Sequence, residues 1–331
     1  MKRGVLCSGN LVLDILVRPV DRPVWGSTSR VESISQHLGG NGGNTSYTLA
    51  KLGVPVRTLG MVGRDPFGDT ILETLRTAGA ETSFVQRSTR PTSTTVGLVD
   101  SRGNRMFLHS LGSSEEMFAE PFEFSRTLCD GYSHYHLGSP FGLPRLRECM
   151  PDVLRAAGAA GLTTSLDTMW DALGRWLEDL AACLPHIGIL FVNEDEARAL
   201  TGADTATAAA WRLRELGAND VVVKLGGNGC AVFGERECFQ CPAFEVEVVD
   251  TTGAGDCFAG GFLGALHRGF SYRDASRFAC AVAALNVGKL GGAEGVLTFD
   301  ETLAWMASAS ARPLEPDILR RGNATVMTPG K

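Results

Sequence analysis

Strand-like apolar segments and helix-like amphipathic segments follow one another through the middle of this 331-residue sequence, and this order constrains the fold most. The predicted strands are at 133–137, 163–167, 187–192, 221–224 and 230–233, and the predicted helices are at 143–157 and 194–200. Neighbouring parallel strands need a long, usually helical, connection, whereas antiparallel strands can be joined by a tight turn. The alternation therefore predicts an α/β fold with a mostly parallel, doubly wound sheet flanked by helices.

An earlier part of the chain departs from this order. Residues 95–99 and 105–109 are strand-like and are separated by a turn rather than a helix, so this pair is predicted to be antiparallel. The segment 92–110 is expected to combine with residues near 12–36. Together they are predicted to form a small β-sheet apart from the main one.

Composition places the chain among ordinary globular proteins, with 44% hydrophobic and 21% charged residues. We predict a single α/β domain over residues 1–311. The tail, 312–331, contains three prolines and a polar end, and is expected to be loosely ordered.

Charge and cysteine content narrow the expected surroundings. The formal net charge of −6 gives no broad positive field, so nucleic acid is not an expected partner. No apolar stretch reaches the roughly 18 residues of a membrane span and the N-terminus is unlike a signal peptide, so we predict a cytoplasmic protein with no membrane partner. The nine irregularly spaced cysteines suit a reducing compartment, and the single pair Cys238 and Cys241 is interpreted as structural.

Residues 248–258 carry the most informative motif. An apolar strand end leads into a glycine-rich turn, which opens a helix whose unpaired N–H groups and dipole make an anion site. Asp256 lies in the first turn of this helix. It could cap the helix, or it could accept the proton of a hydroxyl that attacks a phosphoryl group, and the residues alone leave both interpretations open.

Four ordered motifs resemble the signatures of the ribokinase-like carbohydrate kinases, the PfkB family. They are GGNGGNTSYTLAKLG at 39–53 with GMVGRDPFG at 60–68, N-x-x-E at 193–196, KLGGNG at 224–229, and DTTGAGD at 250–256. The matches are spread along residues 5–299, nearly the whole chain. The resemblance implies a ribokinase-like fold in which the small β-sheet is a lid over the acceptor, and a homodimer formed through that lid.

The resemblance also implies roles for the residues that match. Asp256 would be the catalytic base, and Gly253, Ala254 and Gly255 would supply the amides of the anion hole. The implied acceptor-binding residues are Asp14, Gly40, Asn41 and Asn44, with His109 of the lid as a further candidate. A carboxylate that accepts two hydroxyl hydrogen bonds would explain why an aspartate is tolerated near the end of an apolar strand.

The cofactors implied by the resemblance are ATP and Mg²⁺. The matching nucleotide-binding residues are Asn193, Glu196, Lys224, Gly226, Gly229 and Asn286. Asn193 and Glu196 share one helix face and would act on the water shell of Mg²⁺; taken alone, they would be a helix cap, and Lys224 an ion pair. Asp250 and Thr252 match half of a monovalent-cation site, and the loop 289–296 resembles the other half loosely, so K⁺ is left as an open expectation.

We therefore predict an ATP-dependent kinase that phosphorylates a hydroxyl of a small sugar or nucleoside by direct in-line transfer. An anionic acceptor would need a cluster of cations, and the lid offers only Arg102 and Arg105, so a neutral acceptor is favoured. A non-catalytic metabolite sensor is one alternative, against which the presence of Asp256 argues. A nicotinamide-dependent dehydrogenase is another, but its glycine fingerprint should open at the first strand–helix turn.

Overall fold

The structure is a computed structural model that describes residues 4–120, 122–235 and 237–314. Eight strands form the main sheet: β1 (Gly4–Ser8), β4 (Val56–Leu59), β9 (Tyr132–Gly138), β10 (Thr163–Asp167), β11 (Ile189–Asn193), β12 (Asp220–Lys224), β13 (Cys230–Phe233) and β14 (Cys238–Cys241). Their order is β14-β13-β12-β11-β10-β9-β1-β4. The six strands from β12 to β4 are parallel, and β13 and β14 continue the sheet in antiparallel fashion, which confirms the predicted fold class.

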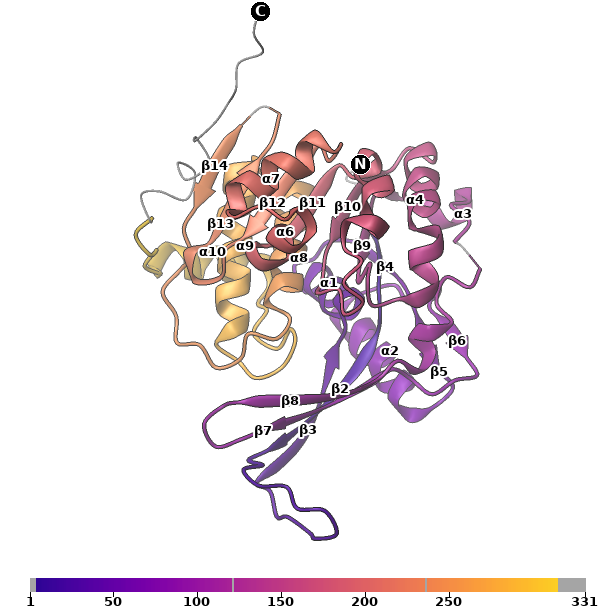
Figure 1. Ribbon diagram of the computed structural model, residues 1–331, viewed down its shortest axis with the longest axis vertical. Coiled ribbons are helices and arrows are strands. Elements are labelled where there is room, and N and C mark those ends of the chain that lie inside the picture. Colours follow the sequence, from indigo (N-terminus) through magenta and orange to yellow (C-terminus); the bar gives the residue numbers. More distant parts are fainter. Residues whose placement is uncertain (1–3, 121, 236, 315–331) are drawn as a thin grey trace, which may run out of the picture.

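Helices cover both faces of this sheet (Figure 1). One face packs on α1 (Asn41–Lys51), α2 (Pro66–Ala78), α8 (Ala254–His267), α9 (Tyr272–Val287) and α10 (Phe299–Ser308). The other packs on α3 (Arg126–Cys129), α4 (Pro144–Ala159), α5 (Leu177–Leu180), α6 (Glu194–Thr201) and α7 (Ala206–Glu215). Alternate strand residues enter the two cores, as Val222 enters one and Val221 and Val223 the other. Burial on both faces explains the continuous apolar runs of the central strands.

The remaining short elements connect these layers. They are the two-stranded parallel sheet β5 (Met61–Gly63) and β6 (Gln86–Ser88), and the 3₁₀ turns η1 (Gly112–Glu115), η2 (Ala181–His186) and η3 (Gly226–Asn228). None of the helices in the described ranges has the length and apolarity that crossing a membrane requires. Most of the predicted C-terminal tail, from residue 315 on, lies outside the described residues.

Four strands form a separate sheet, which we call the lid. They are β2 (Val12–Arg18), β3 (Ser33–Gly39), β7 (Thr94–Val99) and β8 (Arg105–Ser110), in the order β3-β2-β7-β8. In Figure 1 the lid projects from the lower side of the α/β body. The β7–β8 pair is antiparallel, as its turn predicts. The four strands of the lid fall within the predicted segments 12–36 and 92–110, except that β3 continues to Gly39.

The first glycine-rich segment differs from what its composition predicts. The glycines at 39–43 indicate a turn before a helix at 45–52, but the helix already begins at Asn41. A Cβ atom at Gly42 would lie 2.6 Å from the carbonyl carbon of Gly9, so only a residue without a side chain lets α1 pack this closely on the chain after β1. Tertiary packing thus overrides the low helix propensity of glycine here.

Candidate active site

The turn before α8 has a backbone that glycine alone tolerates. Gly253 is the N-cap, with φ of 69°, and a Cβ atom there would lie 1.9 Å from the Gly292 carbonyl oxygen. At Gly255 a Cβ atom would lie 2.9 Å from Nζ of Lys224. Among the described residues, no acceptor takes the N–H groups of Gly253 and Gly255. Two free N–H groups and an ammonium group therefore meet at one helix start, which is a site for an anion.

Asp256 is buried two residues into α8, and its side chain does not cap the helix. Its Oδ1 accepts a hydrogen bond of 2.6 Å from Nδ2 of Asn41, and its Oδ2 accepts one of 2.8 Å from Nδ2 of Asn44. Burial raises the pKa of Asp256, while the Asn44 bond, the Lys224 charge and the Asn41 bond act to lower it. The two amides fix the orientation of the carboxylate.

A small polar network fixes Asn41 in turn. Its Oδ1 lies 2.8 Å from the Ser139 hydroxyl, and its backbone N–H donates to Oδ1 of Asn10 at 2.8 Å. The Ser139 hydroxyl also lies 2.5 Å from the same Asn10 oxygen, and Ser139 has the left-handed φ of 59°, uncommon for a residue other than glycine. Because the Ser139 hydroxyl binds Oδ1 of Asn41, the Nδ2 group of Asn41 faces Asp256. Gly40, the N-cap of α1, completes the turn with φ of 80°.

The lid contributes a row of polar side chains on one face. Its register pairs Asp14 with Thr95 and Thr95 with His109, so the three side chains point to the same side. Thr95 and His109 are hydrogen-bonded at 3.0 Å. Burial raises the pKa of Asp14 to about 6, with Thr95 acting in the opposite direction. A Cβ atom at Gly39 would lie 2.1 Å from the Asp14 carboxylate, so this glycine gives the carboxylate its room.

An ion pair links the ends of β10 and β12. Nζ of Lys224 lies 2.5 Å from Oδ1 of Asp167, whose Oδ2 is buried without a hydrogen-bond partner in the described ranges. Burial raises the pKa of Asp167 to about 7 although Lys224 lowers it. Burial acts to lower the pKa of Lys224, but Asp167 and Glu196 outweigh it, so the ammonium stays charged. Lys224 thus makes the ion pair that was its alternative interpretation, with a partner at the carboxyl end of β10 that the sequence did not predict.

Asn193 and Glu196 form a capping box at the start of α6. Oδ1 of Asn193 accepts from the Glu196 N–H at 2.8 Å, and Oε2 of Glu196 accepts from the Asn193 N–H at 3.1 Å. The Thr168 hydroxyl also donates to Glu196, at 2.7 Å. The structure thus shows the helix cap that N-x-x-E predicts by itself. It also keeps the Glu196 carboxylate buried near Lys224 and Asp256.

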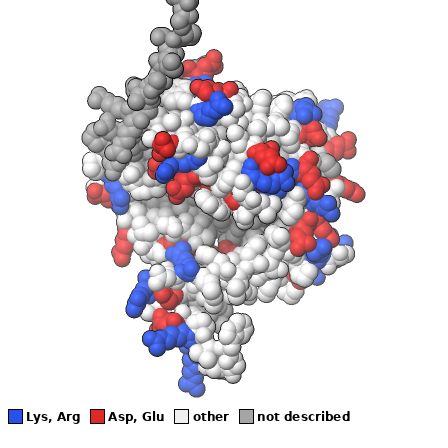
Figure 2. All heavy atoms as spheres, in the orientation of Figure 1, with Lys and Arg blue, Asp and Glu red and all other residues white. Residues whose placement is uncertain are grey.

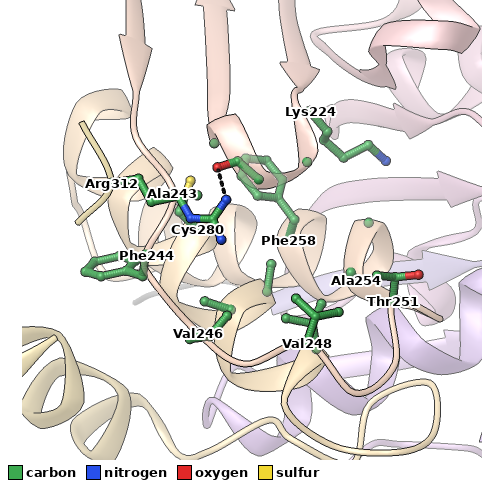
Figure 3. A pocket seen from close by; sticks show the side chains of 17 residues that line it. Lys224, Ala243, Phe244, Val246, Val248, Thr251, Ala254, Phe258, Cys280 and Arg312 are labelled. Atoms are coloured by element: carbon green, nitrogen blue, oxygen red, sulfur yellow. Dashed lines mark hydrogen bonds between the residues drawn. The ribbon is translucent and has the colours of Figure 1, made fainter. Parts of the chain in front are cut away.

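A cavity of about 230 Å³ lies beside the anion site, between α8, α9 and the chain after β12 (Figure 3). Most of its lining is apolar or glycine, and Lys224 and Arg312 are its charged members. Arg312 donates to the Gly227 carbonyl oxygen at 3.4 Å, the bond drawn in Figure 3. The lining includes Gly226, Gly229, Ala243, Phe244, Val246, Phe258, Cys280, Ala283, Ala284 and Val287. Gly226 and Gly229 of the KLGGNG motif therefore line this cavity.

Asn286, one of the predicted nucleotide-binding residues, does not line this cavity. It is fully buried on α9. Its Nδ2 donates to the carbonyl oxygens of Thr252 at 3.2 Å and Gly292 at 3.1 Å, and its Oδ1 accepts from the Gly295 N–H at 3.3 Å. The neighbouring Ala283, Ala284 and Val287 face the cavity instead, because the helix turns by about 100° per residue. Asn286 therefore fastens two loops together.

Asp250 and Thr252 are bound by a lid residue. Nη1 of Arg105 lies 2.5 Å from Oδ1 of Asp250 and 3.1 Å from Oγ1 of Thr252, and Nη2 lies 3.3 Å from the Val249 carbonyl oxygen. The N–H of Gly291 donates to Oδ2 of Asp250 at 3.1 Å. Burial acts to raise the pKa of Asp250, but its hydrogen bonds and Arg105 lower it below the usual range. The ion pair between Arg105 and Asp250 thus joins the lid to the chain before α8.

Three residues of this site were missed in the sequence: Asn10, Ser139 and Asp167. Ser139 directly follows β9, Asn10 comes two residues after β1, and Asp167 ends β10. The rule that ligands bind beyond the carboxyl ends of parallel strands could have found all three.

In space, the lid and body enclose a recess that is visible on the surface in Figure 2.

Comparisons with known proteins identify the family and the fold. A sequence model of the pfkB family carbohydrate kinases matches residues 7–298. An uncharacterized sugar kinase of Archaeoglobus fulgidus is 32% identical over 75% of this chain and 97% of its own length. Ribokinase of Arabidopsis thaliana is 31% identical over 84% of this chain and 74% of its own. Its structure with ribose and ATP has a TM-score of 0.80, 28% identity, and coverage of 92% of this chain and 99% of that one.

The chain therefore belongs to the PfkB family of carbohydrate kinases and has the ribokinase-like fold. It is an ATP-binding phosphotransferase whose acceptor group is an alcohol, and its substrates are sugar-like. One further solved relative, an E. coli protein with ATP and Mg²⁺ bound, has a TM-score of 0.81 at 21% identity, which extends the likeness of fold.

Proposed function

We propose that this kinase transfers the γ-phosphoryl group of Mg²⁺-ATP directly to a hydroxyl of a neutral sugar or nucleoside. The Asp256 carboxylate carries the proposal: it is buried, oriented by Asn41 and Asn44, and next to the free N–H groups of Gly253 and Gly255. An acceptor hydroxyl that donates to Asp256 would lie beside the anion site. Base and anion hole would then act on the same reacting atoms.

The proposed step needs no phosphoenzyme. The acceptor oxygen forms a bond to the γ-phosphorus, its proton passes to Asp256, and the bond between the γ-phosphorus and the bridging oxygen breaks to release ADP. The N–H groups of Gly253, Ala254 and Gly255, with the Lys224 ammonium, would stabilise the negative charge of the transferring group. Of these, the Ala254 N–H already donates weakly to the preceding turn, at 3.3 Å from the Thr251 carbonyl oxygen.

The nucleotide would occupy the apolar cavity. Its small apolar lining residues, including Ala284 and Val287, suit an aromatic base, and Gly226 and Gly229 give the phosphates and ribose a close approach to the backbone. Mg²⁺ bound through waters would be held near Asn193 and Glu196, since Mg²⁺ usually keeps several waters and few protein ligands. In that position it would draw charge from the phosphate oxygens.

The acceptor would lie between the lid and α1. Asp14 would accept two hydroxyl bonds, with Gly40, Asn41, Asn44 and His109 around the ring. Oδ1 of Asn44 supports this placement, because it is buried without a hydrogen-bond partner in the described part of the chain. Neutral acceptors fit best, because Arg105 is engaged with Asp250 and Arg102 lies on an exposed turn.

We further propose a homodimer through the outer face of the lid. Most residues that alternate with the inner polar row are apolar and point away from the site. Several are more than half exposed, which marks a contact surface; they are Ile34, Met106 and Leu108. All nine cysteines are free thiols, which supports the proposal of a cytoplasmic location.

Replacing the proposed base tests this function. Asp256→Asn preserves the shape of the side chain but removes the proton acceptor, so turnover with the best acceptor should fall by roughly 10²- to 10⁴-fold. ATP affinity, measured by calorimetry, should stay near that of the wild type. Asp152→Asn, an exposed substitution on α4, is the matched control and should change neither quantity. Turnover of the Asp256 variant close to the wild-type value would contradict the assignment.

A further inference from the structure

The two loops that flank the anion site are held together by N–H donors. Asp250 begins the first loop and accepts from the Gly291 N–H of the second at 3.1 Å. The Asn286 side chain donates to the carbonyl oxygens of both loops, Thr252 at 3.2 Å and Gly292 at 3.1 Å. These carbonyl and carboxylate oxygens are the groups that a monovalent cation between the loops would need as ligands. They are already hydrogen-bonded.

A positive charge is also already present at this place. The Arg105 guanidinium bonds Asp250, Thr252 and the Val249 carbonyl oxygen at distances of 2.5 to 3.3 Å. The Asp250 side chain is only 2% exposed, so its charge needs a partner. A cation beside the same carboxylate would be repelled by the guanidinium. Asp250 and Thr252 therefore fit a monovalent cation poorly in this chain, a question that the sequence leaves open.

We propose that Arg105 takes the place of a monovalent cation: it neutralises Asp250 and fastens the closed lid to the turn that carries the anion hole. This inference rests on the proposed function. The physical link is short, because Asp250 is three residues before Gly253 and its Oδ1 also accepts the Thr252 N–H at 2.7 Å. Arg105 acts through Asp250 and the turn, so it is a positioning residue rather than a catalytic one.

The proposal connects lid position with the phosphoryl site. Arg105 is on β8 of the lid, whereas Asp250 belongs to the body, so opening the lid breaks the ion pair and leaves a buried carboxylate uncompensated. The cost of that unpaired charge favours the closed state. His109 and Thr95 lie on the same face of the lid as Arg105, so closure also brings the proposed acceptor contacts into place.

Potassium dependence tests this inference. Wild-type activity with the best neutral acceptor should be the same in K⁺ and in tetramethylammonium at equal ionic strength. Arg105→Met should lower the kcat/KM for the acceptor by about tenfold or more in tetramethylammonium, because it leaves Asp250 unpaired. K⁺ should restore part of that loss, and Arg105→Lys should restore part of it without K⁺. Arg102→Met, on the exposed lid turn, is the matched control and should behave as the wild type.

A second readout does not depend on turnover. The melting temperature of Arg105→Met should rise in K⁺ relative to tetramethylammonium, and that of the wild type should not. This measurement also separates the proposal for Arg105 from the proposed function, since the difference in melting temperature is expected even if no tested acceptor is phosphorylated. Wild-type activation by K⁺, a K⁺-dependent wild-type melting temperature, or equal behaviour of the Arg105 and Arg102 variants would overturn the inference. So would a loss in Arg105→Met confined to phosphorylated acceptors, because Arg105 would then bind substrate.

Discussion

The two ends of the proposed active-site crevice differ in composition. The end proposed for the nucleotide is lined by small apolar side chains and glycines, such as Ala283, Ala284 and Gly229. The end proposed for the acceptor is a network of polar groups in which Asn41 and Asn44 hold Asp256. Lys224 and the start of α8 lie between them.

This difference indicates how each end selects its ligand. An apolar cavity selects by shape, and one added or missing methylene changes affinity only modestly. A site of oriented polar groups discriminates more strongly, because a ligand that lacks a hydroxyl leaves a buried group unpaired. Substitutions at the acceptor end should therefore have larger effects than substitutions at the nucleotide end.

The larger effect is expected at Asp14 and depends on pH. Its pKa is raised to about 6 by burial, so the carboxylate is charged above that pH and protonated below it. Only the charged form accepts two hydroxyl bonds, so the kcat/KM for the acceptor should fall as pH decreases through about 6. Asp14→Asn should lower the kcat/KM for the acceptor by roughly 10- to 100-fold at pH 7.5, because a hydrogen bond to a charged group contributes about 1.5 to 3 kcal/mol.

The Asp14 variant supplies its own control for the pH profile. It should lose the step attributed to Asp14 and keep whatever step Asp256 contributes, whose pKa is raised as well. The KM for ATP should not change, since Asp14 lies on the lid and outside the nucleotide cavity. An unchanged pH profile in Asp14→Asn would show that the acceptor does not depend on this carboxylate.

A smaller effect is expected at the nucleotide end. Ala284→Val adds two methyl groups to the cavity wall and should raise the KM for ATP by about three- to tenfold, within the cost of modest overpacking. The KM for the acceptor should stay the same. Ala156→Val, on the exposed face of α4, is the matched control for the helix-propensity cost of valine. A change in acceptor KM equal to the change in ATP KM would break the proposed division of the crevice.

Local motifs predicted the fold and the helix start that carries Gly253 and Asp256. The strand end predicted just before this helix is absent, because residues 242–253 form no strand and only Phe244 makes an isolated bridge. The order of strands and helices likewise predicted the parallel sheet. The cap interpretation of Asp256 could be decided only in space, where its carboxylate accepts from Asn41 and Asn44, more than 200 residues away in the sequence.

Contacts between distant elements could not be predicted in the same way. The pairing of Arg105 with Asp250 joins residues 145 positions apart and depends on how the lid lies over the body. The bonds of Asn286 to the Thr252 and Gly292 carbonyl oxygens could not be predicted either, because an asparagine in a helix gives no sign of which loop it binds. These contacts are also the ones from which we infer that Arg105 replaces a monovalent cation.

The central claim is direct transfer from the apolar end of the crevice to a hydroxyl at the polar end. Its most direct test follows ADP release by the wild type over a panel of neutral sugars, nucleosides and sugar phosphates, with mass spectrometry of the products. We expect ADP and a phosphorylated neutral acceptor in equal amounts, and negligible ADP without an acceptor because the closed lid excludes water. ATP consumption that is the same with and without acceptors, or that occurs only with sugar phosphates, would contradict the account.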